Sequence, residues 1–359
     1  MRPRHRPLLL ALALACACHA GQDGTGFGTP TPTTLSGQTT GGSSTGSSSS
    51  TSTGGEDSTS AGSAAASSSG LLLDMPIPDF GDPPPIGCQG KIDFLFAISA
   101  DGTMQDHQAQ LIDAFPEFMA AIEEQLPEFD VHILVADPDN LFSIPDCAAC
   151  TTSCDPQGDP PLCSAAIDAC DKQIGAGVTF PAGTGATNRR CSLAGGRRYI
   201  TRDEPDLGEA FACIAQVGVW GGDTTAEAMV HALGPALNAP DACNDGFLRD
   251  DALLVATIIN DGYDEASAGT VASWIDALRT AKHGDDDAFA VLVLTTDVDL
   301  GYWQLCHPDQ SGPPNPLRQF ALGVDHGFVG SICEKSYAPF FAETVAELVA
   351  LCDGFVLPQ

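Results

Sequence analysis

The chain has 359 residues and a formal net charge of −32 at pH 7, from 47 acidic and 15 basic side chains. A charge of this size and sign repels nucleic acid and anionic membrane surfaces, so we expect neither as a direct partner. Acidity also keeps exported proteins in solution, and by itself it does not indicate a metal site.

Residues 1–20, MRPRHRPLLLALALACACHA, predict a secretory signal, because arginines precede an apolar run and small residues. The run is too short for a membrane-spanning helix, and no stop-transfer pattern follows it. ALAC, which ends at Cys16, resembles a bacterial lipobox, so we expect lipidation of Cys16 and attachment to a membrane through that lipid only. Ala13 stands where such boxes usually carry Leu. Cys18 is a second candidate, and cleavage after Ala20 would instead release a secreted protein.

Residues 21–87 predict a flexible linker between this signal and a folded domain. Residues 21–70 are almost entirely Gly, Ser, Thr and Ala, which bury too little apolar surface to offset the entropy of folding. The prolines of DMPIPDFGDPPPIG, residues 74–87, then stiffen the approach. The globular part therefore begins near Cys88 and continues to residue 359, which is enough for one large domain with an ample core.

Strand-like and helix-like segments alternate after Cys88. Continuous apolar runs predict strands at 92–99, 129–136, 252–261, 288–296 and 328–332. Helical spacing of apolar residues predicts helices at 104–126, 207–219, 267–282 and 336–352, and one within 221–237 that Thr224 or Thr225 would cap. Pro116 would kink or divide the first of these helices. Strands without period-two alternation are buried on both faces, so the pattern predicts an α/β fold with a mostly parallel central sheet flanked by helices.

The segment from about 137 to 203 shows no periodicity and is too long for an ordinary loop, so we expect a disulfide-rich insertion. Cysteines in an exported chain favour disulfide bonds. Zinc at Cys147 and Cys150 is disfavoured because no matching second pair exists. Cys88 and Cys352 flank the domain, and a bond between them would join its ends; the sequence leaves the other pairings open. The candidate disulfide cysteines are Cys88, Cys147, Cys150, Cys154, Cys163, Cys170, Cys191, Cys213, Cys243, Cys306, Cys333 and Cys352.

Oxygen-bearing side chains follow two of the predicted strands. Ser99, Asp101 and Thr103 stand at alternate positions after the first strand, and Asp261 ends the third. Ligands of open α/β sheets bind at the carboxyl ends of the strands, so we expect these side chains to lie near one another. Thr224 and Thr225 lie in a loop that could reach the same place.

This arrangement resembles the start of a von Willebrand factor type A (vWA) domain, in particular the lipoprotein-like members of myxobacteria. The resemblance covers residues 91–357 and includes NDGFLRDDALL at 244–254, IINDGYDE at 258–265, and a final helix that ends in Cys352 followed by Leu-Pro. It implies a Rossmann-like vWA fold with a metal-ion-dependent adhesion site. The family motif Asp-x-Ser-x-Ser falls on Ser99, Asp101 and Thr103, the late Asp on Asp261, and the middle-loop Thr on Thr224 or Thr225.

The motif is altered, since Ser-x-Asp-x-Thr replaces Asp-x-Ser-x-Ser. Hard divalent cations accept hydroxyl, carboxylate and water oxygens, so one Mg²⁺, Mn²⁺ or Ca²⁺ ion remains a compatible cofactor. Asp101 would put negative charge directly on the metal and weaken capture of an acidic ligand, and the loss of the first carboxylate at Ser99 opposes metal binding. A degenerate loop that keeps only the backbone turn is the alternative.

The implied function is a cell-surface or periplasmic binding or adhesion module for a protein or surface ligand that the sequence does not identify. A metal-free structural or interaction lipoprotein is the alternative. A hydrolase is the least favoured hypothesis, because neither a nucleophile elbow nor a P-loop is present. Asp264 and Glu265 could provide oxygen ligands for Ca²⁺, but we expect them to be solvated. The acidic residues of 244–251 are expected in turns and at a helix start. Ordinary packing explains His107, His132 and His231.

Overall fold

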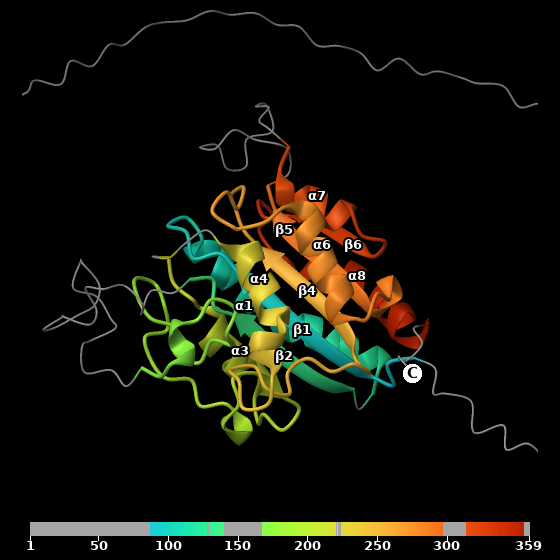
Figure 1. The fold of residues 1–359 in the computed structure, drawn as a ribbon, viewed down its shortest axis with the longest axis horizontal. Coiled ribbons are helices and arrows are strands. Elements are labelled where there is room, and N and C mark those ends of the chain that lie inside the picture. The colour runs from blue at the N-terminus through green and yellow to red at the C-terminus, as the bar shows by residue number, and fades with distance from the viewer. Residues whose placement is uncertain are drawn as a thin grey trace, which may run out of the picture. The chain divides into compact units, whose positions relative to one another are not determined.

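The computed structural model describes residues 87–127, 129–139, 167–219, 221, 224–296 and 314–354 (Figure 1). The polypeptide divides into two units, Met1–Met75 and Pro76–Gln359, and every described residue belongs to the second unit. The expectations for the signal, for Cys16 and Cys18 and for the linker before residue 87 fall outside the described residues. Within the described ranges, no helix is both long and apolar enough to cross a membrane.

A six-stranded sheet in the order β3-β2-β1-β4-β5-β6 forms the centre of the described domain. All neighbouring strands are parallel except β3, which pairs antiparallel with β2 at one edge. The strands are β1 (Lys91–Ile98), β2 (Asp130–Ala136), β3 (Ile200–Thr201), β4 (Leu253–Ile259), β5 (Phe289–Thr295) and β6 (Gly327–Ser331). The sheet is therefore mixed but mostly parallel, as the sequence predicts for an α/β fold.

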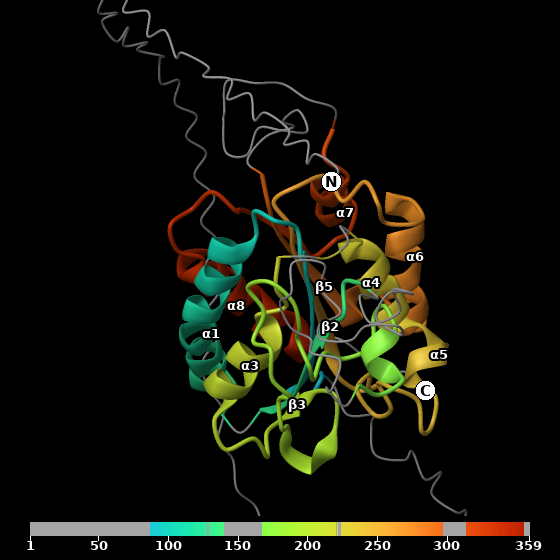
Figure 2. The same cartoon turned by 90° about the vertical axis from the view of Figure 1, so that its left-hand side faces the viewer.

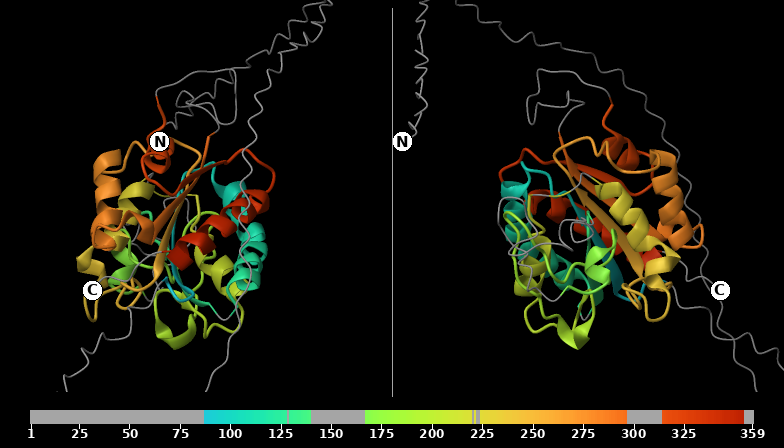
Figure 3. Two further views of the ribbon diagram at one scale, coloured as in Figure 1. Left: turned by 90° about the vertical axis from the view of Figure 1, so that its right-hand side faces the viewer. Right: turned by 60° about the vertical axis from the view of Figure 1, so that its left-hand side comes forward.

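Helices cover both faces of the sheet (Figures 2 and 3). One layer contains α1 (Gln105–Gln125), α3 (Leu207–Ala215) and α8 (Ala338–Gly354). The other contains α4 (Thr225–Leu233), α5 (Pro235–Asn238), α6 (Val271–Ala281) and α7 (Pro316–Leu322). Short 3₁₀ turns lie at Cys170–Lys172, Ala194–Gly196 and Asp286–Ala288.

The side chains of β1 alternate between two hydrophobic cores. Phe94 and Phe96 point into the core under α1, α3 and α8, whereas Leu95 and Ala97 point into the core under α4, α6 and α7. Phe96 also packs against the stacked rings of Phe115 and Phe211, whose centroids lie 3.8 Å apart. Because both faces of β1 are buried, its sequence reads as a continuous apolar run.

The structure confirms the five predicted strands to within one or two residues at their starts and ends, and it corrects several other expectations. Pro116 lies inside a continuous α1 and does not divide it. The helix expected at 207–219 ends at Ala215. Residues 244–251 form turns that lead directly into β4 and start no helix. The two-residue β3 and the short α7 were not predicted, because neither segment is long enough to show a period.

Arg249 holds the 244–251 segment, which leads into β4, in its position beside the sheet. Its backbone N–H and its Nε donate to the two oxygens of the fully buried Asp93, each at 2.8 Å, and its Nη1 donates to Asp130 at 2.6 Å. These bonds tie the segment to the amino ends of β1 and β2. Burial raises the pKa of Asp93 to about 7, while the Arg249 guanidinium opposes the shift.

Disulfide bonds join segments that are distant in sequence. The predicted Cys88–Cys352 bond is present, with the two Cα atoms 4.8 Å apart, and it links the start of the domain to α8. Cys170 pairs with Cys243, and Cys191 pairs with Cys213. Cys333 is also disulfide-bonded. The remaining candidates fall outside the described residues: Cys147, Cys150, Cys154, Cys163 and Cys306.

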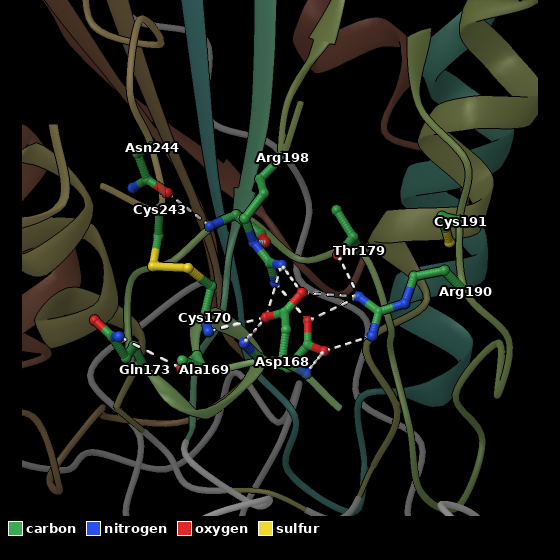
Figure 4. A network of polar contacts seen from close by, with 12 residues as sticks. Asp168, Ala169, Cys170, Gln173, Thr179, Arg190, Cys191, Arg198, Cys243 and Asn244 are labelled. Atoms are coloured by element: carbon green, nitrogen blue, oxygen red, sulfur yellow. Dashed lines mark hydrogen bonds and ion pairs between the residues drawn. A yellow bond between two sulfur atoms is a disulfide. The ribbon is translucent and has the colours of Figure 1, made fainter. Parts of the chain in front are cut away.

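Next to the Cys170–Cys243 bond, Arg190 and Arg198 surround the buried Asp171 in the described part of the insertion; Figure 4 labels both arginines and the adjacent Asp168. Arg190 and Arg198 each place a guanidinium nitrogen 2.6 Å from an oxygen of Asp171. Asp168 lies beside them, and its backbone N–H also donates to Asp171. The Asp171 side chain is 2% exposed, and these hydrogen bonds hold its pKa below the usual range despite the burial. We call this group, Asp168, Asp171, Arg190 and Arg198, the arginine network.

Candidate functional site

The predicted site lies at the carboxyl ends of β1 and β4, in the middle of the sheet. β1 has β2 on one side and β4 on the other, so the chain reverses its winding direction between β1 and β4. Ligands of open α/β sheets bind in the crevice at such a switch point. The Ser99 N–H donates to the carbonyl of Ile259 at 2.9 Å and thereby joins the two loops at this position.

The loop after β1 is fixed by a buried glutamine. The Gln108 amide donates to the carbonyl of Ser99 at 3.0 Å and to that of Gly218 at 2.7 Å, and it accepts from the Gly218 N–H at 3.2 Å. The Ser99 side chain is fully buried, and its Oγ accepts from the Asp101 N–H at 3.2 Å. Ser99 therefore holds the shape of the loop, while Asp101 and Thr103 remain exposed at its surface.

Asp261, which follows β4, lies against this loop. The Thr103 hydroxyl is close enough to its carboxylate to lower its pKa, and the charge of Asp101 acts on it in the opposite direction. Burial and, to a smaller extent, Asp101 raise the pKa of Asp261, whereas Thr103 and His107 oppose the rise. The Asp261 side chain is 2% exposed, and its Oδ2 has no hydrogen-bond partner. The structure thus brings Asp101, Thr103 and Asp261 together and leaves one buried carboxylate oxygen unsatisfied.

The hydroxyl groups of the two threonines at the start of α4 bond to different loops. The Thr224 hydroxyl donates to the carbonyl of Pro138, after β2. The Thr225 hydroxyl accepts from the amide of Asn260 at 2.9 Å, immediately before Asp261. Thr225 is therefore next to the strand end that carries Asp261, whereas Thr224 is turned toward the β2 loop.

Asp264 corrects two expectations. It is 3% exposed and not solvated, and its two oxygens accept from the backbone N–H groups of Thr225 and Ala226, each at 2.9 Å. Thr224 occupies the N-cap position of α4, but its side chain makes no capping bond. The Asp264 carboxylate thus accepts hydrogen bonds from N–H groups in the first turn of α4 that have no partner within the helix. Because Asp264 belongs to the loop after β4, these bonds hold that loop against the start of α4.

His107 is the site residue that sequence reasoning missed. It lies in the first turn of α1, its Nδ1 is 2.8 Å from the Tyr337 hydroxyl, and its Nε2 is 3.8 Å from Asp261 Oδ2. Burial lowers the pKa of His107, and the Asp261 charge opposes that shift. The one available signal was its spacing, since a residue four positions after Thr103 lies on the same side of a helix start.

The donor set is mixed, with the hydroxyl of Thr103, carboxylates from Asp101 and Asp261, and the imidazole of His107. Over the ranges that the structure describes, no three His, Cys, Asp or Glu side chains form a metal-holding group. A cation here would therefore depend on hydroxyl and water oxygens as well as on Asp261, which is a donor set that Mg²⁺, Mn²⁺ or Ca²⁺ accepts. The unpartnered Oδ2 of Asp261 is the feature that fits such an ion.

Comparison with known proteins identifies no family for this chain. No protein-family model and no curated protein matches it. Among solved structures, the pilus adhesin SpaC from Lactobacillus rhamnosus GG, in its open conformation, is similar with 10% sequence identity and a TM-score of 0.35. The matched region covers 73% of this chain but only 30% of the adhesin chain. At this TM-score the similarity assigns neither a family nor a function.

Proposed function

We propose that the domain is an exported binding module of the vWA type, in which a divalent cation at the carboxyl edge of β1 and β4 helps to hold a protein or surface ligand. The unpartnered, buried Oδ2 of Asp261 is the observation that carries this proposal. An ionised carboxylate oxygen without a partner is costly in a buried place, and native structures rarely keep one without a reason. A bound cation would remove that cost.

The placement of the other residues supports a cation at this position. Asp261 and the Thr103 hydroxyl would hold the ion, Asp101 would add charge from the exposed rim, and Ser99 would keep the loop in shape. When bound, the cation supplies an electrophilic centre for an oxygen of the ligand. The negative charge of Asp101 favours a neutral or weakly acidic ligand oxygen over a strong carboxylate.

A metal-free interaction domain is the second candidate, and the raised pKa of Asp261 favours it. A protonated Asp261 would need no cation, and the Thr224 and Thr225 hydroxyls already have protein partners. Neither candidate includes catalysis. Ser99 is fully buried and its Oγ accepts a backbone hydrogen bond, so this serine is poorly placed as a nucleophile.

A thermal-shift titration of the purified, disulfide-bonded mature protein tests the proposal. Millimolar Mg²⁺, Mn²⁺ or Ca²⁺ should raise the melting temperature relative to a chelator, because a ligand that binds only the folded state stabilises it. Asp261→Asn should abolish the rise, and Asp276→Asn, at an exposed acid on α6, should retain it. An equal response of both variants, or no response of the unaltered protein to any metal, would favour the metal-free domain.

A further inference from the structure

A chain of hydrogen bonds orients His107 toward the site. The Tyr337 hydroxyl donates to the carbonyl of Ile332 at 3.0 Å, and the same hydroxyl oxygen is 2.8 Å from His107 Nδ1. A hydroxyl has a single proton, which here is given to Ile332. His107 Nδ1 must therefore carry a proton and donate it to the tyrosine oxygen.

This tautomer leaves a lone pair on the other ring nitrogen. In a neutral imidazole with a protonated Nδ1, Nε2 is an acceptor, and it faces Asp261 Oδ2 across 3.8 Å. The two atoms are too far apart for a direct hydrogen bond. Two electron-rich atoms thus face each other across a gap that neither of them fills.

The gap has the size that one metal ion would span. Zn²⁺ binds imidazole nitrogen and carboxylate oxygen at about 2.0–2.2 Å, and two such ligands in tetrahedral geometry are roughly 3.4 Å apart. A separation of 3.8 Å needs only a slight inward movement of either side chain. Mg²⁺ and Ca²⁺ prefer oxygen ligands, whereas imidazole favours later transition metals.

We propose that His107 Nε2 is a ligand of the site together with Asp261, so that the site selects Zn²⁺ over Mg²⁺ and Ca²⁺. This inference rests on the proposed cation-dependent function and specifies its metal. Metal-ligating histidines almost always donate the other ring N–H to an oxygen that fixes the ring, and the Tyr337 hydroxyl has that place. Tyr337 is fully buried, and it precedes α8, which packs against α1 through Phe341 and Phe118.

Direct metal binding to the mature full-length protein tests this assignment. Isothermal titration with Zn²⁺ and visible absorption with Co²⁺ would be recorded without reductant, and the Asp261→Asn signal would be subtracted to remove binding elsewhere in the chain. His107→Gln should weaken Zn²⁺ binding more than roughly 100-fold, which exceeds the loss expected for a residue that only supports a ligand. It should also remove the Co²⁺ absorption bands and leave the Mg²⁺ thermal shift unchanged. Tyr337→Phe should weaken Zn²⁺ binding about tenfold.

The matched control is His231→Gln, which alters an exposed histidine on α4 that faces Glu227, and it should leave Zn²⁺ binding unchanged. Equal Zn²⁺ affinity in His107→Gln and the unaltered protein would overturn the assignment of His107. A Mg²⁺ or Ca²⁺ response with no Zn²⁺ preference would also overturn it but would leave the proposed function intact. If no metal bound in a manner sensitive to Asp261, both proposals would fail.

Discussion

Asp171 and Asp261 are equally buried, with side chains that are each 2% exposed, but their surroundings are opposite. Asp171 lies in the arginine network and receives hydrogen bonds from two guanidinium groups and a backbone N–H. Asp261 keeps one oxygen without a hydrogen-bond partner. Their pKa values accordingly move in opposite directions, lower for Asp171 and higher for Asp261.

The difference shows how to separate a structural polar cluster from a candidate binding site. Burial raises the pKa of both carboxyl groups, and hydrogen bonds to the charged form reverse that effect only at Asp171. A polar cluster whose groups are all hydrogen-bonded can fix an irregular segment, but it offers no group for binding a ligand. An incompletely satisfied one is less stable by itself and is open to an ion. The following experiments test that distinction.

Among the variants that test this comparison, the largest effect should come from removing the Cys170–Cys243 bond beside the arginine network. Cys170→Ser with Cys243→Ser releases a loop with a sequence separation of 73, and the chain-entropy relation gives a loss of about 4 kcal/mol in the free energy of unfolding. Removing Cys191–Cys213, with a separation of 22, is the control and should cost about 3 kcal/mol. Urea unfolding at pH 7 measures both. A loss below 1 kcal/mol for the longer loop would show that the bond does not constrain this region.

Asp171→Asn should reduce the free energy of unfolding by about 3 kcal/mol, because Arg190 and Arg198 lose their shared, buried counter-charge. Arg279→Gln breaks the exposed pair with Asp286 and should leave the free energy of unfolding nearly unchanged, because solvent screens that pair. Both values come from urea unfolding. Similar costs for the two variants would mean that the arginine network contributes no more than a surface ion pair.

The pH dependence of Asp261→Asn should have the opposite sign to that of Asp171→Asn. The folded-state pKa of Asp261 is raised, so its unfavourable contribution is absent below pH 3.8, grows as the pH rises from 3.8 to the folded value, and is constant above that value. With a chelator present, Asp261→Asn should therefore be about 1 kcal/mol more stable than the unaltered protein at pH 7 and equal to it near pH 3.5.

The Asp171 pKa is lowered, so its favourable contribution is present above pH 3.8 and is lost as the pH falls through the folded value. The cost of Asp171→Asn should shrink with acidification over that range. Unfolding curves of the three proteins at several pH values test both signs. If the two differences changed in the same direction, the contrast between the sites would be refuted.

Asp101→Asn should have the smallest effect on stability, within about 0.5 kcal/mol, because Asp101 is exposed. It should nevertheless weaken the thermal response to divalent cations, since it removes charge from the rim of the site. Parallel melting curves with chelator and with metal separate these two effects. A large loss of stability without metal would instead assign Asp101 a structural role.

The sequence predicted the elements and residues whose signals are local. The apolar runs at β1 and β4 located the sheet, and Ser99, Asp101, Thr103 and Asp261 could be placed at strand ends because parallel strands share one carboxyl edge. The contacts that give the site its chemistry are not local. His107 and Tyr337 are 230 positions apart, and Asp264 is 39 positions from Thr225. Nothing in the periodicity of either segment reports such a partner.

The same reason explains the arginine network. Arg190 and Arg198 have no regular spacing with Asp171, and only the fold of the insertion brings them together. Asp264 illustrates the reverse error: its sequence context is that of a solvated loop, yet it caps α4. The sequence around an acidic residue does not indicate whether a distant helix will place its backbone N–H groups against that side chain.

The Cys88–Cys352 bond has a mechanical consequence. A pull between the segment before residue 88 and a ligand held at the Ser99–Thr103 loop would act along β1, whose parallel neighbours β2 and β4 are hydrogen-bonded over almost its whole length. Such tension is carried by the β1 backbone itself, and the hydrogen bonds to β2 and β4 keep that strand extended within the sheet. Because Cys88 is crosslinked to α8, part of the force would pass into that helix before it reaches β1.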